Sequence, residues 1–216
     1  MWRKLTAFGM AGALAYALHV VLGGLLWKGY SHLEQPISDL TAQGAPDRAL
    51  LTGITSVYAL FSIIFAVSAF MYVRRLKIRL LSTGFILFIL MHIVSASYNI
   101  FPEDLAGAPA TFRGIMHWVV TGAIVPLTIL SVLLIGLGFR RVKGFGGYSA
   151  YSIVTSAILF IAGGTTVFIL SQGLGFFGLF ERINIGSLQL WMFLVSLKLF
   201  NTEIGEGHIS SRQRMP

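Results

Sequence analysis

Residues that could bind or react gather in two segments of this chain that are similar to each other. One reads P-I-S-D-L-T-A-Q-G-A-P-D-R over residues 36–48, and the other reads P-E-D-L-A-G-A-P-A-T-F-R over residues 102–113. In this alignment Asp39 corresponds to Asp104 and Arg48 to Arg113. Carboxylates suit amine or hydroxyl groups, whereas a guanidinium suits phosphate. A duplicated helical hairpin and a chance similarity of loop composition both remain open as origins of this echo.

Other polar side chains recur at helical spacing within apolar segments. Arg113 and His117 are one turn apart, so they share a helix face, and Ser38 stands beside Asp39. The candidates for a ligand site are Asp39, Asp104, Arg113, His117, Glu181, Arg182, His92 and Asn99. The candidates for catalysis are Ser38, Asp39, Asp104 and His117.

The histidines are the residues that could hold a metal ion. His19, His92 and His117 could ligate zinc together with Asp39 and Asp104. However, His92 and His117 are expected at depths that differ by about 10 Å, since a helix rises about 1.5 Å per residue. The chain has no cysteine and no H-E-x-x-H, G-x-S-x-G or Walker motif. We therefore predict no bound metal and no cofactor, with His92 bonding inside the bundle and His117 working beside Asp104 and Arg113.

The composition indicates the elements that must position these side chains. Of 216 residues, 56% are hydrophobic and only 11% are charged, against about 25% in soluble domains. A helix that crosses a membrane needs about 20 apolar residues. Six runs qualify, at 6–26, 51–73, 80–101, 115–138, 150–171 and 183–200. The prediction is an all-α bundle of six transmembrane helices over residues 1–200, followed by a polar tail at 201–216.

The charges predict how this bundle is oriented. Twelve of the 16 Lys and Arg residues lie before run 1, between runs 2 and 3, between runs 4 and 5, or at and after the end of run 6. Short basic loops stay in the cytoplasm, so both termini are expected there, in a multi-pass protein of the cell membrane. The net charge of +8 is thus an orientation signal, which argues against nucleic-acid binding.

The acidic residues have the opposite distribution. Six of the eight are expected on the outer face, and these are Glu34, Asp39, Asp47, Glu103, Asp104 and Glu181. Acids contribute little to topology, so this bias indicates an outward polar site. The first outer loop has about two dozen residues, which is long for a segment without structure of its own, so we expect it to fold back on the bundle. Asp47 is expected to cap the second helix with its side chain.

Three motifs resemble one family over essentially the whole chain. P-I-S-D-L followed by G-A-P, F-P-E-D with a histidine downstream, and G-L-F-E-R-I are similar to the bacterial and archaeal domain of unknown function 998. A more distant similarity, through the I-S-D motif, is to the DRAM and Frag group. The family usually has Gln-Arg-Ile in the last motif, where this chain has Glu181. The resemblance implies six helices and a shared outer site, without an established reaction.

Together these features predict a protein that binds or handles a lipid headgroup or another amphiphile in the outer leaflet. One alternative is a membrane-embedded hydrolase or transferase acting on such a lipid, so the enzyme question stays open. Another alternative is a structural or regulatory partner of a second membrane protein. Membrane lipids are the expected partners, and a homo-oligomer or a membrane-protein complex is also compatible with the sequence.

Single cysteines introduced into this cysteine-free chain test the orientation. Cysteines at positions 74–79 and 140–144 should resist an impermeant thiol reagent added to intact cells, whereas cysteines at 36–48 should react, because basic loops stay inside. Lysed cells are the control, since every accessible position then reacts. Labelling from outside at position 75 or 141 would contradict this topology.

Overall fold

The computed structural model describes residues 1–204, and all the helices and strands assigned in this part of the chain are helices. The elements are α1 (Trp2–Leu5), α2 (Phe8–Leu26), η1 (Ser38–Thr41), α3 (Arg48–Val73), η2 (Arg74–Leu76), α4 (Arg79–Ala96), η3 (Ser97–Asn99), α5 (Phe112–Phe139), α6 (Gly146–Gln172) and α7 (Phe177–Asn201). Six helices are long and apolar enough to cross a membrane, which confirms the predicted fold class. Most of the predicted tail, from residue 205, lies outside the described residues.

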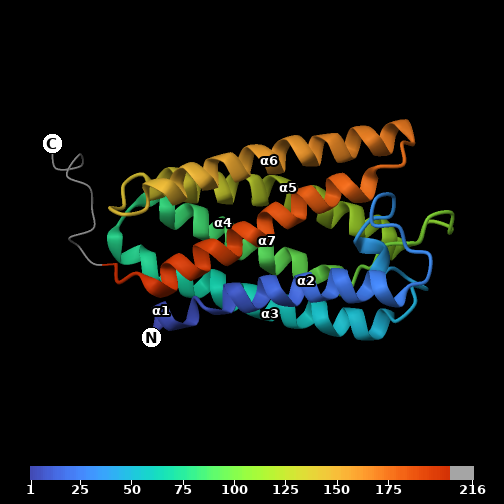
Figure 1. Cartoon of the computed structure of the whole chain (residues 1–216), viewed down its shortest axis with the longest axis horizontal. Coiled ribbons are helices and arrows are strands. Elements are labelled where there is room, and N and C mark those ends of the chain that lie inside the picture. Colours follow the sequence, from blue (N-terminus) through green and yellow to red (C-terminus); the bar gives the residue numbers. More distant parts are fainter. Residues whose placement is uncertain (205–216) are drawn as a thin grey trace.

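The long helices run side by side, and their ends gather at the two ends of the molecule (Figure 1). The loops 27–47, 100–111 and 173–176 lie at one end, called here the acidic end because the six acidic residues named above lie there. The loops 74–78 and 140–145, together with α1 and the end of α7, form the basic end. Both ends of the described chain are therefore on one side of the bundle. Which side of a membrane that is remains a prediction.

The six long helices form a closed ring. Each packs against the next in sequence, and α2 packs against α7 to complete the circle. The side chains at its centre include Phe65, Phe85, Phe88, Phe139 and Trp191, all fully buried. The contact between α2 and α7 is also polar, because the Ser196 hydroxyl accepts from the Met10 backbone N–H at 3.1 Å.

Glycines bring α4 and α5 into backbone contact. A Cβ added at Gly84 would lie 2.7 Å from the Ile135 side chain and 2.8 Å from its backbone nitrogen. A Cβ added at Gly138 would lie 2.7 Å from the Leu81 backbone nitrogen. Small residues allow transmembrane helices to approach this closely. The helices α4 and α5 are therefore in close contact where α4 begins and α5 ends, at the basic end of the bundle.

Two helix boundaries and one helix cap differ from the prediction in ways that matter for the site. The last helix begins at Phe177 instead of near residue 183, so Glu181 and Arg182 lie one turn inside it. The third run ends its α-helix at Ala96 and continues as η3. The prediction that Asp47 caps α3 with its side chain is wrong, because its left-handed backbone (φ 53°) leaves no such bond. The side chain of Thr111 does cap α5, accepting from Gly114 at 3.1 Å.

Gly138→Ala should lower the thermal unfolding midpoint of the detergent-solubilised protein. The added methyl would clash with the Leu81 backbone, and overpacking of this kind lowers the free energy of unfolding by about 1–3 kcal/mol. Gly122→Ala is the matched control on the same helix, because a Cβ there meets nothing within 4 Å. It should leave the midpoint unchanged or raise it, since alanine favours helix by up to about 1 kcal/mol. Equal midpoints for the two variants would contradict close packing at Gly138.

Candidate functional site

The loop between α2 and α3 folds onto the acidic end of the bundle, as the sequence analysis predicts. Its short helix η1 buries Leu40 completely, and Ile37 and Leu40 pack with Leu51 of α3. Tyr30 closes the first half of the loop by donating its hydroxyl to the Pro36 carbonyl at 2.7 Å. Apolar anchoring at Ile37 and Leu40 places the intervening residues, Ser38 and Asp39, against the bundle.

Arg182 ties this loop to α7. One terminal nitrogen donates to the Gln35 and Gly178 carbonyls, both at 2.9 Å, and the other donates to the Tyr30 hydroxyl at 2.6 Å. Gly178 must be small here, because a Cβ would collide with the Gln35 carbonyl. Since the guanidinium bonds to carbonyls of both segments, it fixes the loop against the first turns of α7.

Glu181 provides the complementary contact. Its carboxylate accepts a hydrogen bond of 2.5 Å from the Ile37 backbone N–H, directly before η1. Glu181 and Arg182, which are adjacent on α7, thus bond to one backbone donor of the loop and to two of its acceptors. An amide at position 181 could accept the same bond, so the family's usual glutamine would also suit this contact.

The two loops with similar sequences bind each other. The Gln43 N–H donates to the Glu103 carbonyl at 2.9 Å, and the Gln43 side chain donates to Asp104 at 2.7 Å. Asp104 also accepts from the Thr111 N–H and hydroxyl at the start of α5. These bonds, the one from the Thr111 backbone first, lower the pKa of Asp104. Asp104 therefore holds the loops together as a carboxylate.

Three acidic side chains lie at the acidic end close enough to influence one another's charge, and we call Asp39, Glu103 and Glu181 the carboxylate cluster. The charge of Glu103 acts on both Asp39 and Glu181. One Glu103 oxygen is buried without a hydrogen-bond partner, 3.9 Å from Nε2 of His117. The His117 Nδ1 lies 3.0 Å from the Phe101 carbonyl, and donation there would leave Nε2 free to face Glu103.

Burial changes the acidity of the cluster. Asp39 is only 5% exposed, and its burial, together with the charge of Glu103, raises its pKa to about 6. Burial also raises the pKa of Glu103, although a hydrogen bond from Ser38 partly opposes the rise. Asp39 and Glu103 therefore keep protons at pH values where exposed carboxyl groups have lost them.

Several predicted candidates lie elsewhere. Arg113 is exposed and makes no hydrogen bond or ion pair within residues 1–204. Asn99 bonds to Thr55 and Ser56 of α3, at 3.2 and 2.9 Å. The prediction that His92 bonds inside the bundle is wrong for the described residues, since both ring nitrogens lack partners and the ring packs edge-on to Phe88 instead. Within residues 1–204 no three His, Asp or Glu side chains are grouped as a metal site.

Sequence reasoning passed over Glu103 and Tyr30. The echo between the two loops drew attention to Asp104, because Asp104 aligns with Asp39. In the structure it is the preceding residue, Glu103, that reaches Asp39. The six acids expected on one face were the available signal, but nothing in their order indicates which of two adjacent acids points inward.

The arrangement limits the chemistry of the site. Ser38 influences the pKa of Glu103, and Glu103 in turn lies 3.9 Å from His117. A serine hydrolase triad instead places the histidine between the serine and the acid. What the cluster offers is an unpartnered carboxyl oxygen beside other acids, which favours a group that donates protons or carries positive charge.

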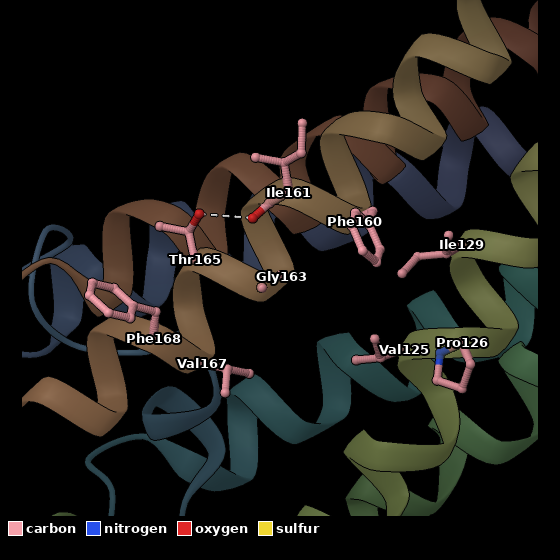
Figure 2. A pocket seen from close by; sticks show the side chains of 10 residues that line it. Val125, Pro126, Ile129, Phe160, Ile161, Gly163, Thr165, Val167 and Phe168 are labelled. Atoms are coloured by element: carbon pink, nitrogen blue, oxygen red, sulfur yellow. Dashed lines mark hydrogen bonds between the residues drawn. The ribbon is translucent and has the colours of Figure 1, made fainter.

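An apolar groove lies on the outside of the bundle, between α5 and α6. Figure 2 shows its lining side chains on the two facing helices, including Pro126 on α5 and Phe160, Val167 and Phe168 on α6. Its volume is about 660 Å³. Gly163 and Gly164 carry no side chains, which widens the space on the α6 side. The groove faces the region where lipid chains surround a transmembrane bundle.

Comparison with known proteins identifies the family of this chain, and it identifies no individual relative. Searches among curated proteins and among solved structures give no match for this chain. The similarity to the DRAM and Frag group stays a prediction. The family described as "Protein of unknown function (DUF998)" matches residues 10–198, which include nearly all of the membrane bundle. The chain therefore belongs to the DUF998 family.

Proposed function

We propose that the protein binds the amine or hydroxyl headgroup of an amphiphile at the carboxylate cluster. The observation that carries this proposal is the buried Glu103 oxygen without a partner. A buried acceptor left unsatisfied costs about 1–3 kcal/mol, and more when it is charged. A donor group from a ligand would remove that cost. In this proposal the acidic end faces outward from the cell membrane.

The charges around the cluster favour an amine or hydroxyl over a phosphate. Asp39, Glu103 and Glu181 would repel an anion. The terminal nitrogens of Arg182 already bond to the loop and to α7, and Arg113 is exposed with no contact to the cluster. Only the buried Nε of Arg182 lacks a partner, so neither arginine presents a free terminal nitrogen to a phosphate in the cluster.

The depth of the cluster favours an amphiphile over a fully soluble ligand. His117 lies five residues after the start of α5, at the level where a helix enters the apolar region. Phe112 and Trp118 are exposed on the same turns, as aromatic residues are at a membrane interface. The groove of Figure 2 begins at Val125, about 12 Å deeper along α5, and offers apolar surface for a chain.

One contact favours a second candidate, a hydrolase or transferase acting on a lipid. The Ser38 side chain lies near enough to Glu103 to lower the pKa of that carboxyl group, so in this candidate Glu103 would accept the serine proton as a general base. Ser38→Ala separates the candidates, because a binding protein should retain affinity for the headgroup while an enzyme should lose turnover of it.

Glu103→Gln should weaken binding of dodecylamine to the purified protein by about tenfold or more, because charge-assisted hydrogen bonds contribute about 1.5–3 kcal/mol. Binding is measured below the micellar concentration of the ligand, with the protein in a neutral detergent. Glu34→Gln is the matched control, since Glu34 is an exposed glutamate of the same end. Dodecyl phosphate should bind the wild-type protein more weakly than dodecylamine. Equal affinities for the two ligands, or an equal loss in both variants, would refute the proposal.

The affinity for dodecylamine should rise as the pH increases from 5 to 7. The pKa of Asp39 is about 6 in the folded protein, so this carboxyl group gains its charge across that interval while the amine stays protonated. Asp39→Asn should flatten the profile, and Glu34→Gln should leave it unchanged. A wild-type affinity that is independent of pH over this range would contradict ionisation of Asp39 in binding.

A further inference from the structure

A layer of uncharged polar side chains lies inside the ring of helices, deeper in the bundle than the carboxylate cluster. It consists of Tyr58 and Ser62 on α3, His92 on α4 and Gln189 on α7, which we call the interior polar layer. Ser62 and His92 are fully buried, and Gln189 is only 8% exposed. Gln189 follows Glu181 by eight residues on α7, so it lies about 12 Å deeper. Neither the family membership nor the proposed function assigns a role to these residues.

Tyr58 brings the interior polar layer together. Its hydroxyl accepts from Nε2 of Gln189 at 2.9 Å, and its ring lies edge-on to the ring of His92, with 6.1 Å between the centroids. Ser62 is one turn further along α3, and its hydroxyl lies near that of Tyr58. Gly12 of α2 packs against Ser62, since a Cβ there would lie 3.1 Å from the serine hydroxyl. Four helices therefore meet around these side chains.

Several polar atoms of this layer are buried without a hydrogen-bond partner among residues 1–204. They are Oγ of Ser62, both ring nitrogens of His92 and Oε1 of Gln189. Buried polar groups are almost always bonded, and one without a partner lowers stability. Ser131 shows the usual arrangement, because it is equally buried but donates to the Thr128 carbonyl at 2.9 Å. The concentration of unpartnered atoms in one layer therefore points to a bound group that supplies their partners.

The surroundings of the layer are aromatic and uncharged. Phe88 packs edge-on against His92, with ring centroids 4.5 Å apart, and against Trp191, with centroids 5.3 Å apart. On the α2 side, the ring of Tyr16 packs edge-on against that of Tyr58 at 4.8 Å. A charged ligand would lose its hydration here without gaining an opposite charge, which is costly. The surroundings therefore favour a neutral group.

We propose that the interior polar layer binds a neutral hydroxyl group. A neutral imidazole at His92 offers one donor and one acceptor, Oε1 of Gln189 offers an acceptor, and the Ser62 hydroxyl offers both. A hydroxyl group matches this set, because it donates and accepts without carrying charge. The hydroxyl belongs to a water molecule, which needs two to four polar partners, or to an alcohol, and the two sources are separated by experiment.

Nuclear magnetic resonance of the wild-type protein tests the proposal without altering the layer. The protein carries isotope labels only in histidine and is held in a deuterated detergent without hydroxyl groups, and the His92 ring signals are assigned by their loss in His92→Phe. The His92 ring protons should show cross-peaks to water or, after 1-butanol is added, to the CH₂ protons beside the alcohol hydroxyl. The first result identifies water as the ligand, and the second identifies an alcohol. Cross-peaks to protein protons alone, with and without 1-butanol, would overturn the proposal.

Variants of the layer check that its side chains hold the hydroxyl group. Gln189→Leu and Ser62→Ala should each weaken the cross-peaks of His92 by about threefold, because each removes one neutral hydrogen-bonding group. Thr128→Val is the matched control, since Thr128 is also buried but donates to the Ile124 carbonyl of its own helix at 2.9 Å, and it should leave the cross-peaks unchanged. Unchanged unfolding midpoints exclude a general loss of structure. Equal cross-peaks in all three variants would contradict the proposal, and none of these outcomes depends on ligands of the carboxylate cluster.

Discussion

The acidic end depends on one constraint, which is that Arg182 and Glu181 lie inside a helix at membrane depth and need partners there. Charged groups away from water are costly unless they are bonded. The α2–α3 loop supplies those partners through the Gln35 carbonyl, the Tyr30 hydroxyl and the Ile37 N–H. The same bonds hold the loop down, so its apolar side chains become buried. Burial of the loop then brings Asp39 to Glu103, and the unusual acidity of the cluster follows from that approach.

The two ends of the bundle differ in charge, although the same six helices form both. At the acidic end, long loops cover the helix ends and bury Asp39 and Glu103, whose pKa values are raised. At the basic end, short loops leave the start of α6 open beside Arg140. The distribution of charge that indicates orientation in the sequence thus recurs in the structure, with acids at one end and basic loops at the other.

The helices could be predicted from sequence because spanning a membrane requires only length and apolar character, and both are visible residue by residue. The start of α7 could not, because Phe177–Arg182 contains charges that become helical and buried only with the loop as partner. The arrangement of the carboxylate cluster was harder still to predict from the sequence. Glu103 and Asp104 are neighbours with the same chemistry, and bonds from Gln43 and Thr111 hold Asp104 at the start of α5 while Glu103 turns inward. His92 was expected to bond, but its neighbours are mainly aromatic rings.

The bond between Glu181 and Ile37 spans 144 residues of sequence, and the bond between Ser196 and the Thr6 carbonyl spans 190. Chains emerge from the ribosome in order, so the first loop is made long before its partners on α7 exist. Until the last helix inserts, Asp39 and the carbonyls of that loop must remain hydrated. The acidic end can therefore be completed only after the sixth span has been synthesised. A chain that stops after α6 would lack the α7 partners of the loop and the α2–α7 contact that closes the ring.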